Sequence, residues 1–97
     1  MPFQTFFVRS FNRASIWRDA PANAGIYGLS NAREWIYIGI SDDIRGDLLR
    51  HLDGDAAVGE RQPTGFTFEL ARPGDRIARQ DQLVRELEPY CNRLRRP

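Results

Sequence analysis

Two short apolar segments joined by a few turn-forming residues restrict the fold of this chain more than any other feature. Gly25 to Leu29 and Trp35 to Ile40 are rich in the β-branched and aromatic residues that favour strands. The connection begins with Ser30-Asn31-Ala32-Arg33, and asparagine tolerates the left-handed backbone of a tight turn. Strands joined by so short a connection pair antiparallel, so the sequence predicts a β-hairpin.

The second strand of this hairpin is apolar on both sides. Strict alternation would place Trp35, Tyr37 and Gly39 on one face of the strand. It would place Ile36, Ile38 and Ile40 on the other face. Two apolar faces are typical of a strand covered on both sides, so we expect it at the centre of a sheet.

Three further elements follow the hairpin. Ser41-Asp42-Asp43 predicts the start of a helix over about 43–52. Residues 65–70 alternate, with Phe66, Phe68 and Leu70 on one side, and predict a half-buried strand. A second helix over about 76–88 is stopped by Pro89. Its inward row is apolar except for one glutamine: Ile77, Gln80, Leu83, Val84 and Leu87.

The element order is β-β-α-β-α, which predicts an α+β fold with a small sheet of about three strands, mixed or antiparallel, flanked by helices. We expect one domain over residues 1–97, with an N-terminal arm (1–23), a core (24–92) and a basic tail (93–97). In the arm, residues 3–11 form either a strand or an extended segment, and residues 10–19 form a short helix. The Gly- and Asp-rich segment 53–63 predicts an exposed loop.

Composition narrows the class of protein. Hydrophobic residues make up 41% and charged residues 28% of the 97, which excludes a disordered tail. The longest apolar run is far shorter than the roughly 20 residues of a membrane span, so we expect no membrane association. The single cysteine, Cys91, excludes an internal disulfide and favours a reducing, cytoplasmic setting.

Charge gives little support for a nucleic-acid partner. Fourteen basic residues, all arginine, oppose thirteen acidic ones, for a net charge of +1. Such a balance provides no broad basic surface. We therefore expect any binding to DNA to be weak and salt-sensitive.

The hairpin also carries a motif. Gly25-Ile26-Tyr27, nine further residues and then Tyr37-Ile38-Gly39 resemble the GIY-YIG nuclease domain. Pro89-Tyr90-Cys91-Asn92 is similar to the Pro-x-x-Asn that closes many family members, so the resemblance covers residues 24–92. It implies an endonuclease that cuts DNA with one divalent metal ion, usually Mg²⁺.

The resemblance assigns roles to three residues of this chain. It implies that Tyr27 takes the proton of the attacking water and that Tyr37 positions water or phosphate. It implies that His51 lies on the first helix near that water, where the family often has histidine or tyrosine. The motif alone supports these roles, because each tyrosine could equally be an aromatic strand residue packed in the core.

Two charged positions of the family are substituted. The family has an arginine ten positions after the second tyrosine, and this chain has Asp47. It has a metal-binding glutamate nine positions before the closing proline, and this chain has Gln80. Losing one charge stabiliser slows an active site about a hundred- to a thousand-fold. A neutral amide is also a poor ligand for Mg²⁺, which proteins hold through carboxylates.

Other residues could compensate. Arg50 is a substitute cation, and Arg45 and Arg50 are candidate nucleic-acid contacts. Asp81, or Asp47 with His51 four positions later, is a substitute metal site. The plainer interpretation of each is a solvated residue or a local ion pair.

Three hypotheses follow from these residues. The first is a catalytically impaired GIY-YIG-like protein that binds nucleic acid or a protein partner. The second is an active DNA endonuclease with a rearranged site that uses Mg²⁺ or Mn²⁺, ions that the first would not need. The third is a protein-interaction module whose N-terminal arm forms a homodimer through a strand edge.

Overall fold

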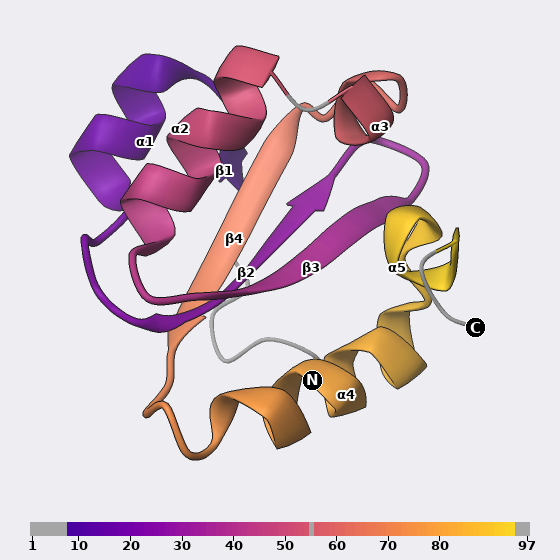
Figure 1. Cartoon of the computed structure of the whole chain (residues 1–97). Helices are drawn as coiled ribbons and strands as arrows, with labels where there is room; N and C mark the ends of the chain where they lie inside the picture. The colour runs from indigo at the N-terminus through magenta and orange to yellow at the C-terminus, as the bar shows by residue number, and fades with distance from the viewer. Residues whose placement is uncertain (1–7, 55, 95–97) are drawn as a thin grey trace.

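The computed structural model describes residues 8–54 and 56–94, and it is an α+β fold with a four-stranded antiparallel sheet (Figure 1). The elements in chain order are β1 (Arg9–Ser10), α1 (Arg13–Asp19), β2 (Gly25–Ser30), β3 (Trp35–Ser41), α2 (Ile44–Gly54), α3 (Ala56–Gly59), β4 (Gly65–Leu70), α4 (Arg76–Leu87) and α5 (Tyr90–Leu94). The predicted fold class and hairpin are confirmed. The sheet has one strand more than expected because Arg9 and Ser10 pair with β4.

The strand order is β1-β4-β2-β3, so β3 lies at an edge and the prediction of a central strand was wrong. Both faces of β3 are nevertheless covered, since Ile36 and Ile38 are fully buried in separate apolar clusters. The exposed edge is occupied by a side chain from α5. Asn92 Oδ1 accepts a hydrogen bond from Ile38 N at 2.7 Å, and Asn92 Nδ2 donates to Ile38 O at 2.9 Å. The asparagine amide thus takes the place of a neighbouring strand.

Strict alternation fails near the start of β3. Leu29 pairs with Tyr37 and Ser30 pairs with Trp35, so Ile36 is the extra residue of a β-bulge. As a result Ile36 belongs to the same apolar cluster as Tyr37, and Trp35 packs with Ile38 on the other side. The predicted face assignment of β3 was therefore wrong before Tyr37.

The two faces of the sheet are packed by different helices (Figure 1). The larger cluster involves α1 and α2, and its buried residues are Ile16, Ala20, Tyr27, Leu29, Ile36, Ile44, Leu48, Val58, Phe66 and Cys91. The smaller cluster involves α4, and its buried residues are Ile26, Ile38, Leu83 and Val84. We refer to these as the α2 face and the α4 face.

Three details of the predicted burial pattern were wrong. Ile77, assigned to the inward row of α4, is 70% exposed. Leu70 is 55% exposed, although β4 was expected to bury it. Thr67 and Glu69, expected on a solvated face of β4, are both buried. β4 is therefore covered on both faces, because α4 packs over the side that its polar residues occupy.

The segment predicted as an exposed loop contains α3, and Val58 is fully buried in the α2-face cluster. A four-residue helix is too short to be predicted from the periodicity of its apolar residues. α5 was also not predicted, and it follows Glu88, whose φ of 49° lies in the left-handed region.

Parts of the predicted arm and tail, residues 1–7 and 95–97, lie outside the described residues, as does residue 55. The strand alternative for residues 3–11 can therefore be followed only over Arg9–Ser10. Among the helices that are described, none has the length and apolar character needed to cross a membrane.

Candidate functional site

Tyr27 lies near the middle of β2, and its ring extends across the neighbouring strand. Tyr27 pairs with Gly39, the glycine of the second motif triplet. A Cβ atom added at Gly39 would lie 2.5 Å from Cζ and 2.6 Å from the hydroxyl oxygen of Tyr27. These separations are well below contact distance, so Gly39 must lack a side chain for the Tyr27 ring to lie there. The two triplets are therefore linked by packing.

The Tyr27 hydroxyl makes a short hydrogen bond with the imidazole of His51, which lies on α2. The oxygen and His51 Nε2 are 2.6 Å apart. Tyr37 completes the group, with its ring centroid 6.0 Å from that of Tyr27 and 5.4 Å from that of His51. The three residues that the resemblance assigned to the reacting water thus converge.

The start of α2 is fixed by local hydrogen bonds. Ser41 Oγ accepts from Asp43 N at 2.9 Å, and Asp43 Oδ1 accepts from Gly46 N at 3.1 Å. This capping supports the helix start that the sequence predicted. Ile44 and Leu48 are buried against the sheet, which orients the helix so that His51 meets Tyr27.

The group opens onto a hollow of about 460 Å³, which we call the tyrosine hollow. It is lined by Tyr27, Tyr37, Ile40, Asp47, Arg50, His51 and Gly54. Asp47, at the position where the family has arginine, forms an ion pair with Arg50 three residues later on the helix. The Asp47 side chain is 17% exposed and that of Arg50 is 74% exposed. The hollow therefore contains one acidic and one basic side chain, which are paired with each other.

Arg45, a candidate nucleic-acid contact, points elsewhere. Its Nε donates to the carbonyl oxygen of Ala20 at 2.9 Å, and its guanidinium lies 5.0 Å from the centroid of the Trp17 ring. Arg45 thus joins α2 to α1 and is not among the lining residues of the tyrosine hollow. Of the two arginines that the sequence proposed, Arg50 is the one beside the tyrosines.

Gln80 is bound to the main chain of β3. Its Nε2 donates to Ile38 O at 3.0 Å, the same carbonyl that accepts from Asn92. A carboxylate at this position could not make that bond, because it has no proton to donate at neutral pH. Gln80 and its exposed neighbour Asp81 are not among the residues that line the tyrosine hollow.

The donor atoms fit a divalent metal ion poorly. Gln80 carries no charge and uses its amide nitrogen on a main-chain carbonyl, and the Asp47 carboxylate is paired with Arg50. Within residues 8–54 and 56–94, no three histidine, cysteine or acidic side chains are grouped so that they could hold a metal. We therefore derive no reaction step through a metal ion at this site.

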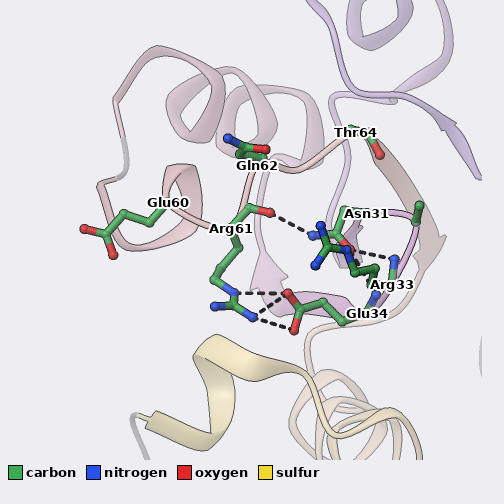
Figure 2. Close-up of a pocket in the computed structure, with 8 residues that line it drawn as sticks. Asn31, Arg33, Glu34, Glu60, Arg61, Gln62 and Thr64 are labelled. Atoms are coloured by element: carbon green, nitrogen blue, oxygen red, sulfur yellow. Dashed lines mark hydrogen bonds and ion pairs between the residues drawn. The ribbon is translucent and has the colours of Figure 1, made fainter.

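A second hollow of about 440 Å³ was not predicted from the sequence (Figure 2). It lies between the β2–β3 turn and the segment after α3, and we call it the turn hollow. Arg61 there makes three hydrogen bonds of 2.7 to 3.0 Å to the carboxylate of Glu34 and stacks 3.9 Å from the centroid of the Tyr90 ring. Glu34 and Arg61 are 27 positions apart, so no local pattern pairs them.

Another missed pair is buried on the α4 face. Arg79 Nε donates to Glu69 Oε2 at 2.7 Å and its NH2 donates to Oε1 at 2.9 Å. The Glu69 side chain is only 3% exposed. The hydrogen bonds that Arg79 donates to Glu69 raise the pKa of the Arg79 guanidinium. The sequence offered only the weak signal of a glutamate among the polar positions of an alternating strand.

Among known proteins, similarity to this chain was found in solved structures. Neither a protein-family model nor a curated protein matches the chain. The magnesium-bound structure of the GIY-YIG N-terminal endonuclease domain of UvrC from Thermotoga maritima matches with a TM-score of 0.64 at 19% identity, covering 77% of this chain and 92% of that one. A point mutant of the same domain, bound to its catalytic divalent cation, matches with a TM-score of 0.64 at 19% identity, covering 77% and 91%.

At this level of identity the match shows a shared fold. Together with the paired tyrosine strands, it shows that the chain has a GIY-YIG-like fold, as the motif predicted. The similar solved domain is an endonuclease that binds a divalent metal ion.

Proposed function

We propose that this GIY-YIG-like domain binds nucleic acid through the tyrosine hollow and that metal-dependent cleavage is impaired in it. The observation that carries the proposal is the ion pair between Asp47 and Arg50 beside Tyr27. An acid stands where the resemblance implies a cation, and it neutralises the nearest arginine. The growing negative charge of a phosphoryl transition state would lack the stabilisation that such reactions require.

The position that the resemblance gives to the metal-binding glutamate supports the same conclusion. Gln80 is used to hold the edge of β3, where its amide donates to Ile38 O. The Tyr27–His51 pair is intact and could still hold or move a proton. The proposal therefore describes a domain that keeps the proton-handling part of the site and lacks the charged part.

Binding is tested with labelled single-stranded, duplex and branched DNA in EDTA. Because the chain carries a net charge of only +1, we expect weak dissociation constants, of the order of 10⁻⁶ to 10⁻⁴ M, that weaken further as salt rises. Arg50→Gln should weaken binding. Affinity that does not change with salt, or with Arg50→Gln, would contradict binding through this hollow.

Cleavage is tested with the same DNAs in Mg²⁺ and in Mn²⁺. We expect no more cleavage from the wild type than from Tyr27→Phe. Tyr90→Phe is a matched control, since Tyr90 stacks on Arg61 at the turn hollow. Robust cleavage that Tyr27→Phe abolishes and Tyr90→Phe leaves intact would overturn the proposed impairment and favour an active nuclease with a rearranged site.

We also propose a cytoplasmic location. The support is that the chain has a single cysteine, Cys91, which is buried in the core and has no second cysteine to form an internal disulfide. Fractionation of expressing cells tests this, and recovery of the protein mainly from an oxidising compartment would contradict it.

A further inference from the structure

Within the described part of the chain, the arginine of the tyrosine hollow is paired with a residue of its own helix. Arg50 and Asp47 form a pair at positions i and i+3 of α2. Such helix pairs are weak when they are exposed to solvent, and Arg50 is 74% exposed. The guanidinium can therefore leave its partner at little cost.

The two members of the pair differ in freedom. The Asp47 side chain is short and only 17% exposed, and its backbone N–H bonds to Asp43 O in the first turn of the helix at 3.0 Å. Arg50 has a long side chain that is mostly exposed to solvent. The carboxylate is thus the fixed member and the guanidinium the mobile one.

The rest of the hollow suits a phosphate group. Among the described residues that line it, Arg50 is the one side chain with a permanent positive charge. The Tyr27 and Tyr37 rings stand beside it with the His51 imidazole. Phosphate accepts two parallel N–H bonds from a guanidinium and carries its charge on several oxygens, so it can displace a single carboxylate.

The turn hollow has a similar volume, but its part-buried arginine is less available to an anion. The Arg61 guanidinium makes three hydrogen bonds to Glu34, so releasing it would break a part-buried bidentate pair (Figure 2). It also lies 3.9 Å from the centroid of the Tyr90 ring. That arginine acts as a structural tie between segments, whereas Arg50 is held by one neighbour on the same helix.

We propose that Asp47 is an internal competitor of the ligand: its carboxylate occupies Arg50, and a nucleic-acid phosphate binds the tyrosine hollow by taking the guanidinium from it. The inference rests on the proposed function and adds the residue that sets the affinity. It needs no metal ion. Asp47 acts through Arg50 and is therefore a residue that tunes binding.

The test measures binding of a fluorescein-labelled single-stranded oligonucleotide in EDTA to the wild type, Asp47→Asn, Arg50→Gln and the double variant. Removing the competing charge should tighten binding by Asp47→Asn about three- to ten-fold at low salt. In the double variant the gain should vanish, leaving the affinity of Arg50→Gln.

Glu86→Gln is the matched control. It removes one carboxylate charge from an exposed position of α4. That helix packs on the α4 face, on the other side of the sheet from the tyrosine hollow, so solvent and salt should screen the charge from a bound phosphate. We expect Glu86→Gln to change affinity less than about two-fold.

A gain equal to that of Glu86→Gln, or one that persists without Arg50, would overturn the inference. If the wild type binds and Arg50→Gln weakens it while Asp47→Asn has no effect, the proposed function stands and only the inference fails. If neither the wild type nor Asp47→Asn binds the oligonucleotide, both fail. Thermal unfolding checks each variant, and Asp47→Ser, which also removes the charge, should reproduce the gain if Asp47→Asn is unstable.

Inorganic phosphate distinguishes two sources of the same chemistry. If the hollow is a nucleic-acid site, free phosphate should displace the bound oligonucleotide only weakly, because the strand also contacts the aromatic rings of the hollow. If Asp47→Asn gains affinity for inorganic phosphate and none for the oligonucleotide, the hollow is a site for a free anion and the nucleic-acid assignment is wrong.

Discussion

On the α2 face of the sheet, polar side chains line an open hollow, whereas on the α4 face they are bound within the fold. The α2 face presents the Tyr27–His51 pair and an exposed arginine. The α4 face buries Glu69 against Arg79 and ties Gln80 to the β3 main chain. The two faces share the same strands but leave different groups available to a ligand.

This difference shows that the tyrosines are held by packing, whereas the side chain at position 80 is used by the fold. The tyrosines are retained by packing, since Tyr27 is part of the larger apolar cluster and covers Gly39. Gln80 contributes to the edge of β3, where its amide donates a second hydrogen bond to Ile38 O beside that of Asn92. The fold therefore favours an amide at position 80, whereas binding of Mg²⁺ would favour a carboxylate there.

The largest expected effect comes from breaking the buried pair of the α4 face. Glu69→Ala leaves the Arg79 guanidinium without its carboxylate in a site that is 19% exposed. We expect the free energy of unfolding to fall by about 3 kcal/mol. Urea denaturation measures this, and Glu86→Ala, at an exposed position of α4, should change it by less than about 0.5 kcal/mol. Equal effects would show that the buried pair adds nothing.

The next effect tests whether Gln80 belongs to the fold. Gln80→Glu places a carboxylate against Ile38 O, two acceptors that repel, and should cost about 1–3 kcal/mol of unfolding free energy in EDTA. Gln82→Glu is the matched change at an exposed position of α4. Adding Mg²⁺ should not restore the stability of Gln80→Glu. Restored stability would mean that the new carboxylate binds a metal ion. The α4 face would then also offer a group to a ligand, which would contradict the difference between the two faces.

A smaller effect is expected on the α2 face. Tyr27→Phe removes the hydroxyl that bonds to His51 Nε2 and should lower the unfolding free energy by about 1 kcal/mol. The ¹⁵N resonance of His51 Nε2 should shift at the same time. An unchanged resonance would show that the bond does not form in solution.

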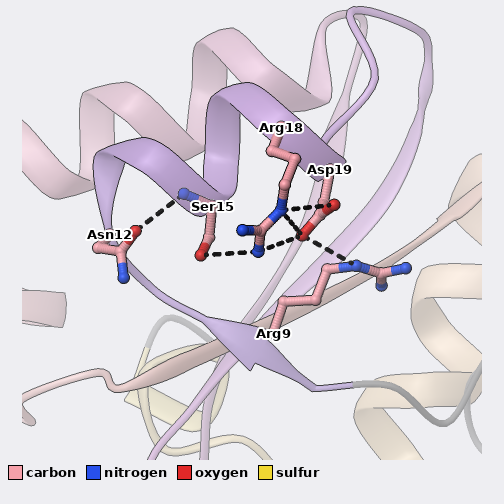
Figure 3. A network of polar contacts seen from close by, with 5 residues as sticks. All are labelled: Arg9, Asn12, Ser15, Arg18 and Asp19. Atoms are coloured by element: carbon pink, nitrogen blue, oxygen red, sulfur yellow. Dashed lines mark hydrogen bonds and ion pairs between the residues drawn. The ribbon is translucent and has the colours of Figure 1, made fainter.

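The smallest effect concerns an exposed pair at the end of α1 (Figure 3). Hydrogen bonds from Arg18 lower the pKa of the Asp19 carboxyl below its ordinary value of 3.8, and the charges of Arg18 and Arg9 act in the same direction. The stabilisation is therefore present above pH 3.8 and is lost as the pH falls through the lowered pKa.

The measurement compares the unfolding free energies of the wild type and Asp19→Asn from about pH 6 to about pH 2. The advantage of the wild type should shrink on acidification and should be far smaller than the effect of Glu69→Ala, because solvent screens an exposed pair. A difference that stays constant with pH would contradict the role of the Asp19 charge.

Local patterns predicted most of the elements and part of the site. The hairpin, α2, β4 and α4 follow from residue type and periodicity, and the two triplets identified the tyrosines that converge with His51. Burial was predicted less well. Ile77 continues the apolar row of α4 but is exposed, because the helix contacts the sheet mainly through Leu83 and Val84.

By itself the sequence determined the paired triplets and the acidic residue at position 47, since each depends on residue identity alone. Only the tertiary structure decided that β3 lies at an edge, that Ile36 is an extra residue in a bulge, and that Gln80 bonds to a carbonyl 42 positions away. Those outcomes depend on which segments meet across the sheet, and contacts between distant residues leave no periodic trace in the chain.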